Sequence, residues 1–149
     1  MRHELPVGTS AELIHLVTGH DSAIQLRMGS GDDFPDVLAT SRMIGLMELT
    51  AARLMRPVLH HGELSVGVRV DVVHLAATPL YEKIRIQATF LGLEGKLYRF
   101  QVELFDQGGK VGEGTHLRAV VRPDRLVESA QRRIAAGQPD TTESARDGS

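Results

Sequence analysis

One long amphipathic segment, followed by a run of alternating residues, constrains the fold of this chain more than any other feature. Residues 35–59 have helical periodicity, and their apolar residues share one side: Ile44, Met47, Ala51, Leu54 and Val58. Pro35 fits the first turn of a helix, whereas Thr40 or Ser41 fits the N-cap of a helix that starts later. We favour the later start.

Residues 64–122 alternate with period two and predict four strands. The first alternating set is Val66, Val68, Val70 and Val72, and His74 continues it. Short turns at residues 93–96 and 106–109 indicate hairpins, and we interpret all three links as hairpin links of an antiparallel meander. A single helix ahead of such a sheet has to bury its apolar side on the concave face. The pattern therefore predicts an α+β fold, a curved antiparallel sheet around one long central helix.

The length of 149 residues favours one domain, which we place at residues 1–136. Within it, residues 12–18 fit an additional first strand. Residues 124–136 fit an amphipathic C-terminal helix, expected to pack on the outer face of the sheet. The small and polar residues 137–149 predict a disordered tail.

Composition excludes several classes of protein. The chain has no cysteine, so disulfides, thiolate metal sites and a cysteine nucleophile are excluded. A net charge of -2 and 4% aromatic residues argue against nucleic-acid binding. No apolar run is long enough to span a membrane, and the first residues lack the apolar region of a secretory signal. We therefore expect a cytoplasmic protein.

Three polar residues stand where the pattern predicts apolar ones. His74 is either a histidine satisfied by a backbone carbonyl or a general base. Glu48 either reaches solvent or pairs with an arginine, or else it is a carboxylate held in a cleft for catalysis. Thr40 is either a plain helix cap or a hydroxyl beside backbone N–H groups that hold an oxyanion.

The spacing of Thr40 and Glu48 limits how they act together. Eight residues of straight helix separate them by roughly 12 Å, so they cannot hydrogen-bond directly. A substrate of that length, a chain that folds back or a second subunit would let both act on one molecule. This limit favours a site between subunits.

Four segments, in this order, resemble the fluoroacetyl-CoA thioesterase-like family of hotdog-fold acyl-CoA thioesterases. They are residues 34–40 (FPDVLAT), 45–48 (GLME), 74–79 (HLAATP) and 114–120 (GTHLRAV). The resemblance covers residues 7–122. It implies a hotdog fold and a homodimer with active sites at the subunit interface, and it leaves open whether two dimers form a tetramer.

The resemblance also implies roles for single residues. A threonine, a glutamate and a histidine carry hydrolysis in that family, and they match Thr40, Glu48 and His74. A glycine near the acyl carbonyl matches Gly67, and an arginine of the substrate channel matches Arg118. The alternatives are that Gly67 marks a bulge and that Arg118 is a solvated strand arginine.

The lid differs from that of the fluoroacetyl-specific enzyme. Phe34 matches one of its phenylalanines, but Gly31 and Leu38 stand where it has two others. We therefore expect Phe34 to contact substrate in a looser pocket that takes a different acyl group.

The leading hypothesis is an acyl-CoA thioesterase that releases free acid and CoA, with no metal and no cofactor. A non-catalytic dimer that binds acyl-CoA is the alternative. An enoyl-CoA hydratase is disfavoured because Asp71 and His74, three residues apart on a strand, face opposite sides. Candidate cations for the CoA phosphates are Arg53, Lys83, Arg85, Arg99 and Arg118.

Overall fold

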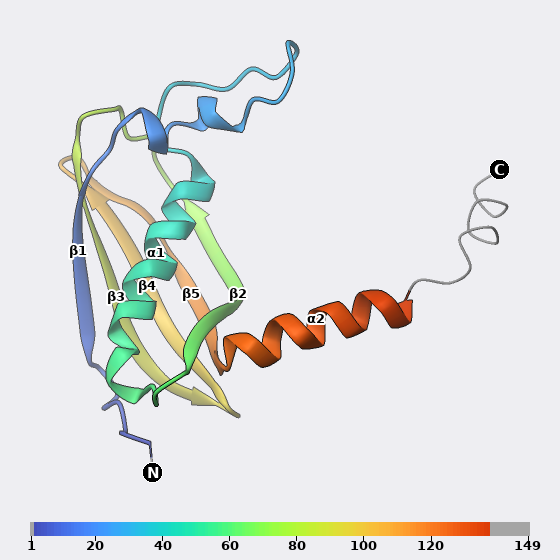
Figure 1. Cartoon of the computed structure of the whole chain (residues 1–149). Helices are drawn as coiled ribbons and strands as arrows, with labels where there is room; N and C mark the ends of the chain where they lie inside the picture. Colours follow the sequence, from blue (N-terminus) through green and yellow to red (C-terminus); the bar gives the residue numbers. More distant parts are fainter. Residues whose placement is uncertain (1, 138–149) are drawn as a thin grey trace, which may run out of the picture.

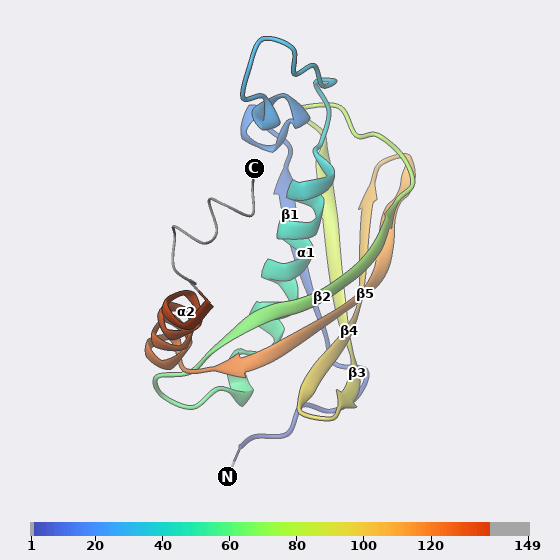
Figure 2. The same cartoon turned by 90° about the vertical axis from the view of Figure 1, so that its right-hand side faces the viewer.

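Five antiparallel strands form one sheet that curves around helix α1 (Thr40–Leu54), as Figures 1 and 2 show. The structure is a computed structural model that describes residues 2–137. The strands are β1 (Ser10–Leu16), β2 (Leu64–His74), β3 (Lys83–Glu94), β4 (Leu97–Asp106) and β5 (Gly109–Val121), and helix α2 (Pro123–Gly137) follows. Short 3-10 turns lie at Gly19–Asp21, Ala23–Leu26 and Arg56–Val58. The predicted α+β class is confirmed.

The strand order is β1-β3-β4-β5-β2, so the predicted meander is wrong at its first link. β3, β4 and β5 are joined by hairpins, as predicted, but β2 pairs with β5 and not with β3. The link at residues 75–82 crosses the sheet instead of turning back. It is anchored by Thr78, whose carbonyl accepts from Leu38 N–H and whose hydroxyl donates to Asp106. β1 then occupies the free edge of β3.

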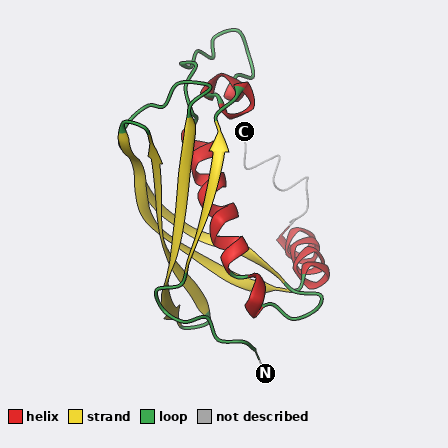
Figure 3. Ribbon diagram, turned by 90° about the vertical axis from the view of Figure 1, so that its left-hand side faces the viewer, coloured by secondary structure: helices red, strands yellow, loops and turns green. Residues whose placement is uncertain are grey.

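Helix α1 lies along the concave face of the sheet (Figure 3). Its apolar side chains pack against that face. Met43 and Met47 from the helix are buried together with Ile86, Phe100 and Leu104 from the sheet. The helix begins at Thr40, so the predicted later start is confirmed. Ala39 occupies the N-cap, however, so neither Thr40 nor Ser41 is the cap.

Strand β2 carries a bulge that breaks the predicted valine face. Gly67 pairs with Arg118, whereas Arg69 pairs with Leu117, so one residue of β2 is extra. Val66 and Gly67 are neighbours and point to opposite faces, and Gly67 faces α1. The prediction that Val66 shares the face of the later valines is therefore wrong. β2 is also an edge strand with one side unpaired among the described residues.

Helix α2 is present as predicted, but its expected packing on the sheet is wrong. It extends away from the sheet, and none of its residues is buried (Figures 1 and 2). Leu126, Val127 and Ile134 remain about half exposed because no element of the described chain covers them. Residues 138–149 of the predicted tail lie outside the described residues. No helix in residues 2–137 combines the length and hydropathy that crossing a membrane needs.

Candidate active site

Thr40 and His74 meet where α1 begins and β2 ends. The Thr40 Oγ1 atom lies 2.7 Å from His74 Nδ1. Burial lowers the pKa of His74, with a smaller opposing effect from the Ala76 backbone, so the imidazole is neutral at pH 7. His74 Nε2 is buried and has no hydrogen-bond partner among the described residues. A neutral histidine beside a hydroxyl is the arrangement that removes a proton from a nucleophile.

An apolar cavity of about 520 Å³ adjoins this pair. It is lined mainly by the segment before α1 and the segment after β2, including Phe34, Leu38 and Ala76. Phe34 is 38% exposed, at an edge that substrate can reach. The structure thus brings three predicted site residues, Phe34, Thr40 and His74, into one cavity.

Glu48 lies two turns further along α1, against a different set of residues. Its Oε1 atom is 3.5 Å from Arg118 Nη1 and 4.0 Å from His116 Nε2. Gly67 of β2 faces it so closely that a Cβ atom there would collide with Glu48 Oε1. The glycine therefore provides the space that the carboxylate occupies.

Arg118 is buried, and its donors are directed at protein atoms. Its Nε donates to Ser65 Oγ and its Nη2 to the Ser65 carbonyl, each at 2.9 Å. Its Nη1 donates to His116 Nε2 at 3.0 Å. Burial lowers the pKa of Arg118, and the Glu48 carboxylate opposes that effect. The guanidinium thus lies beneath Glu48 in a fixed orientation.

Within one chain the predicted catalytic residues form two separate groups. Thr40 contacts His74, whereas Glu48 contacts Arg118 beside Gly67. This separation agrees with the limit that helix geometry sets. The sequence pattern does not single out Ser65 or His116, although His116 belongs to the 114–120 segment and shares a strand face with Arg118.

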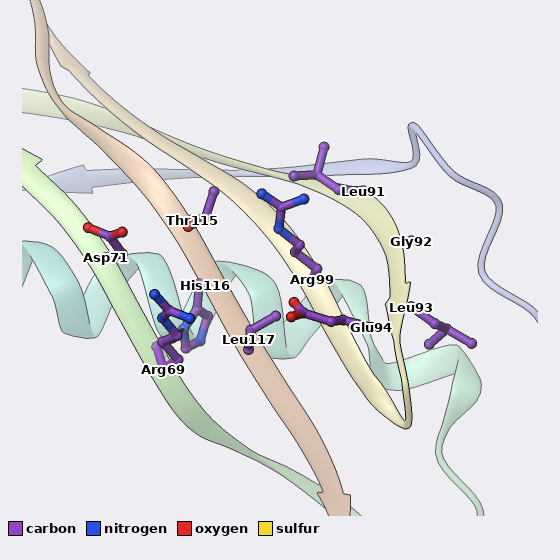
Figure 4. A pocket seen from close by; sticks show the side chains of 10 residues that line it. All are labelled: Arg69, Asp71, Leu91, Gly92, Leu93, Glu94, Arg99, Thr115, His116 and Leu117. Carbon is purple, nitrogen blue, oxygen red and sulfur yellow. Dashed lines mark hydrogen bonds between the residues drawn. The ribbon is translucent and has the colours of Figure 1, made fainter.

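A second hollow, of about 390 Å³, lies on the face of the sheet away from α1 (Figure 4). Arg69, Asp71, Arg99 and Thr115 line it, so one of the predicted phosphate-binding residues, Arg99, is placed there. Arg85 instead lies over the Phe105 ring, at 4.4 Å from its centre. Within residues 2–137, no three acidic or histidine side chains come together as metal ligands.

The fluoroacetyl-CoA-specific thioesterase family model matches residues 17–124 of the chain. The chain belongs to this family. It is 36% identical to the fluoroacetyl-CoA thioesterase of Streptantibioticus cattleyicolor over 105 residues, which are 70% of the chain and 76% of that protein. The predicted family, the hotdog fold and the enzyme class of thioester hydrolase are thereby confirmed.

Solved structures of thioesterases have the same fold as this chain. A mutant of the fluoroacetyl-CoA-specific thioesterase in complex with fluoroacetate and CoA superposes with a TM-score of 0.77 at 33% identity. That alignment covers 81% of this chain and 98% of the other. A thioesterase superfamily member from Thermus thermophilus superposes with a TM-score of 0.77 at 26% identity, over 89% and 95% of the two chains.

The space at Gly67 yields a first prediction. Gly67→Ala places a methyl group where the Glu48 carboxylate lies and 3.0 Å from His116 Cε1, so the flexible carboxylate has to move and the His116 ring has to give slightly. We expect kcat for thioester hydrolysis to fall by up to about 10²-fold, because small displacements of reacting groups have such effects. The free energy of unfolding should change by less than about 1 kcal/mol. Gly19→Ala, where a Cβ meets no atom within 4 Å, should change neither quantity. Equal activity of the two variants would contradict the prediction.

Two histidines, the half-buried His74 and the buried His116, predict how stability depends on pH. The folded pKa of both His74 and His116 is lowered, first of all by burial, from the unfolded value of 6.5. Below that value the unfolded chain binds more protons, so the free energy of unfolding should fall as pH falls from 6.5 toward the folded values. Thermal unfolding across this range measures it. His116→Gln does not titrate and should reduce the slope, and an unchanged slope would contradict the assignment to His116.

Proposed function

We propose that the protein hydrolyses acyl-CoA thioesters to free acid and CoA, with Thr40, Glu48 and His74 as the reacting groups. The contact of 2.7 Å between Thr40 Oγ1 and His74 Nδ1, at the edge of an apolar cavity, is the observation that carries the proposal. The membership of the chain in a family of thioesterases supports the reaction type.

The geometry suggests a different role for each group in the attack on the thioester. His74 Nδ1 accepts the Thr40 proton, so that Thr40, or a water held by it, attacks the carbonyl carbon. The first N–H groups of α1 lie beside Thr40, and the N-cap Ala39 offers no side chain to occupy them. These N–H groups can stabilise the oxyanion, and the N–H of Gly67 can join them only from a second copy of the chain, because Gly67 lies beside Glu48 and not beside Thr40. The protonated His74 then gives its proton to the departing CoA thiolate. Where Thr40 is the nucleophile, a water deprotonated by His74 cleaves the resulting Thr40 ester, which releases the free acid as Thr40 regains its proton from His74.

We infer that a second copy of the chain completes each site. The free edge of β2 can pair with the same edge of a second copy, because antiparallel pairing about a two-fold axis is self-complementary. Such pairing places the Gly67 end of one strand beside the His74 end of the other. Glu48, which lies against Gly67, then approaches the Thr40–His74 pair of the other subunit. Its carboxylate can accept the His74 Nε2–H bond that the described residues leave unmade.

The acyl group is proposed to differ from fluoroacetyl. The curated relative acts on fluoroacetyl-CoA, but Gly31 and Leu38 replace two aromatic lid residues in the resemblance described above. Phe34 therefore stands at the cavity without them. Arg118 lies beside Glu48 and is therefore the candidate for contacting CoA at this site, whereas Arg99 lies on the other face of the sheet. The cytoplasm remains the proposed compartment.

The proposed function is tested with a panel of acyl-CoA substrates from acetyl to long-chain and aryl groups. Release of free CoA thiol is measured with a thiol-reactive dye. His74→Ala and Glu48→Ala should each lower kcat by about 10²–10⁴-fold, as expected on removal of an acid–base group. The exposed His20→Ala is the control and should keep full activity. Full turnover by both site variants would contradict the proposal, and binding without thiol release across the panel would favour the non-catalytic alternative.

The shared site is tested by mixing two inactive variants. If Glu48 of one subunit serves the Thr40–His74 pair of the other, a heterodimer of Thr40→Ala and Glu48→Gln chains contains one intact site. Unfolding and refolding the two chains together should therefore restore activity, toward about one-quarter of the wild-type rate per chain for random pairing. Each variant refolded alone is the control. No recovery, with dimers confirmed by sedimentation, would place the three residues in one chain's own site.

A further inference from the structure

We propose that His116 is a positioning residue, which holds the Arg118 guanidinium beneath Glu48 and so keeps that carboxylate in place for hydrolysis. The inference rests on the proposed function of Glu48 and adds a residue to it. His116 is 1% exposed and comes from β5, on the same face as Arg118.

The two hydrogen bonds of the ring specify its protonation state. His116 Nδ1 lies 2.8 Å from the Arg69 carbonyl, which only accepts, so Nδ1 carries a proton. His116 Nε2 lies 3.0 Å from Arg118 Nη1, which only donates, so Nε2 presents its lone pair. Burial is the main cause that lowers the pKa of His116, the Arg118 charge adds to it, and the Arg69 carbonyl and Glu48 oppose it. The ring is therefore neutral, with one tautomer fixed by the bulge of β2.

This tautomer makes His116 an acceptor for a buried arginine. Ser65 holds Nε and Nη2 of Arg118, and His116 holds Nη1. Nη1 also approaches Glu48 Oε1, at 3.5 Å. Without His116, Nη1 would lose its acceptor at 3.0 Å and would be left with the Glu48 oxygen at 3.5 Å, so the guanidinium would no longer be held on that side. The orientation of the Arg118 guanidinium beneath Glu48 thus depends on both Ser65 and His116.

Glu48 depends on that charge for its place. Its side chain is 41% exposed, so packing alone does not fix its rotamer. Arg118 attracts the carboxylate from one side, and Gly67 leaves room for it on the other. His116 Nε2 itself is 4.0 Å from Glu48 Oε1, too far for a hydrogen bond. His116 therefore acts on Glu48 through Arg118 and is not placed to touch substrate.

A double-mutant cycle tests this route. His116→Leu is made in the wild-type chain and in Glu48→Gln, with His116→Gln as the matched variant that keeps one donor and one acceptor. In the wild-type chain, His116→Leu should lower kcat by up to about 10²-fold without raising KM, since a reacting group is misplaced. His116→Gln should retain most of kcat. In Glu48→Gln, the same change to leucine should have little further effect, because the carboxylate it positions is absent.

The other outcomes separate the inference from the proposed function. An equal loss of kcat from His116→Leu in both backgrounds, or no loss in the wild-type chain, would overturn the positioning role. Full activity of Glu48→Gln alone would overturn the proposed function, and this inference with it. If His116→Leu does not fold, Ser65→Ala replaces it, because Ser65 Oγ holds the other side of Arg118. That variant should lower kcat only where Glu48 is present, and equal losses would overturn the inference.

Discussion

The burial of one side of α1 against the concave sheet determines where every proposed catalytic group stands. Because that side is packed along the length of the helix, Thr40 and Glu48 cannot approach each other by local movement. Each of them instead meets a different part of β2, Thr40 at its end and Glu48 at Gly67. The packed helix thus holds the two groups of polar residues at a fixed separation. The packing of the core sets this separation, and the surrounding loops do not.

Local periodicity was sufficient to predict most elements but not how they pair. The start of α1 at Thr40 and the four later strands follow from the spacing of apolar residues, which the chain carries within each segment. The pairing of β2 with β5 depends on contacts between distant segments, so a meander was predicted instead. The bulge after Gly67 is indicated only by the glycine itself, which inside a strand can mark a bulge, because the run of alternating valines continues through it.

The same distinction applies to the proposed site, where the sequence pattern indicates the unusual residues but not the residues that they contact. Thr40, Glu48 and His74 were recognisable because each is a polar residue in an apolar pattern. The residues around Glu48 were not recognisable, because the approach of Arg118 and His116 to Glu48 depends on the register between β5 and β2. The packing of the exposed apolar stripe of α2 could not be predicted for a related reason. Amphipathic spacing shows that a helix has an apolar face, but it does not show what that face contacts.

The two polar groups differ in how completely a single chain satisfies them, and this difference links assembly to chemistry. Glu48 already has a cationic neighbour in Arg118, so its charge is compensated before any partner arrives. His74 is less completely satisfied, because its buried Nε2 atom lacks a hydrogen-bond partner among the described residues. In the proposed dimer, a carboxylate supplied across the β2 edge removes that deficit. The contact that stabilises the interface is then the same contact that activates the histidine, and formation of the dimer and formation of the active site become one event.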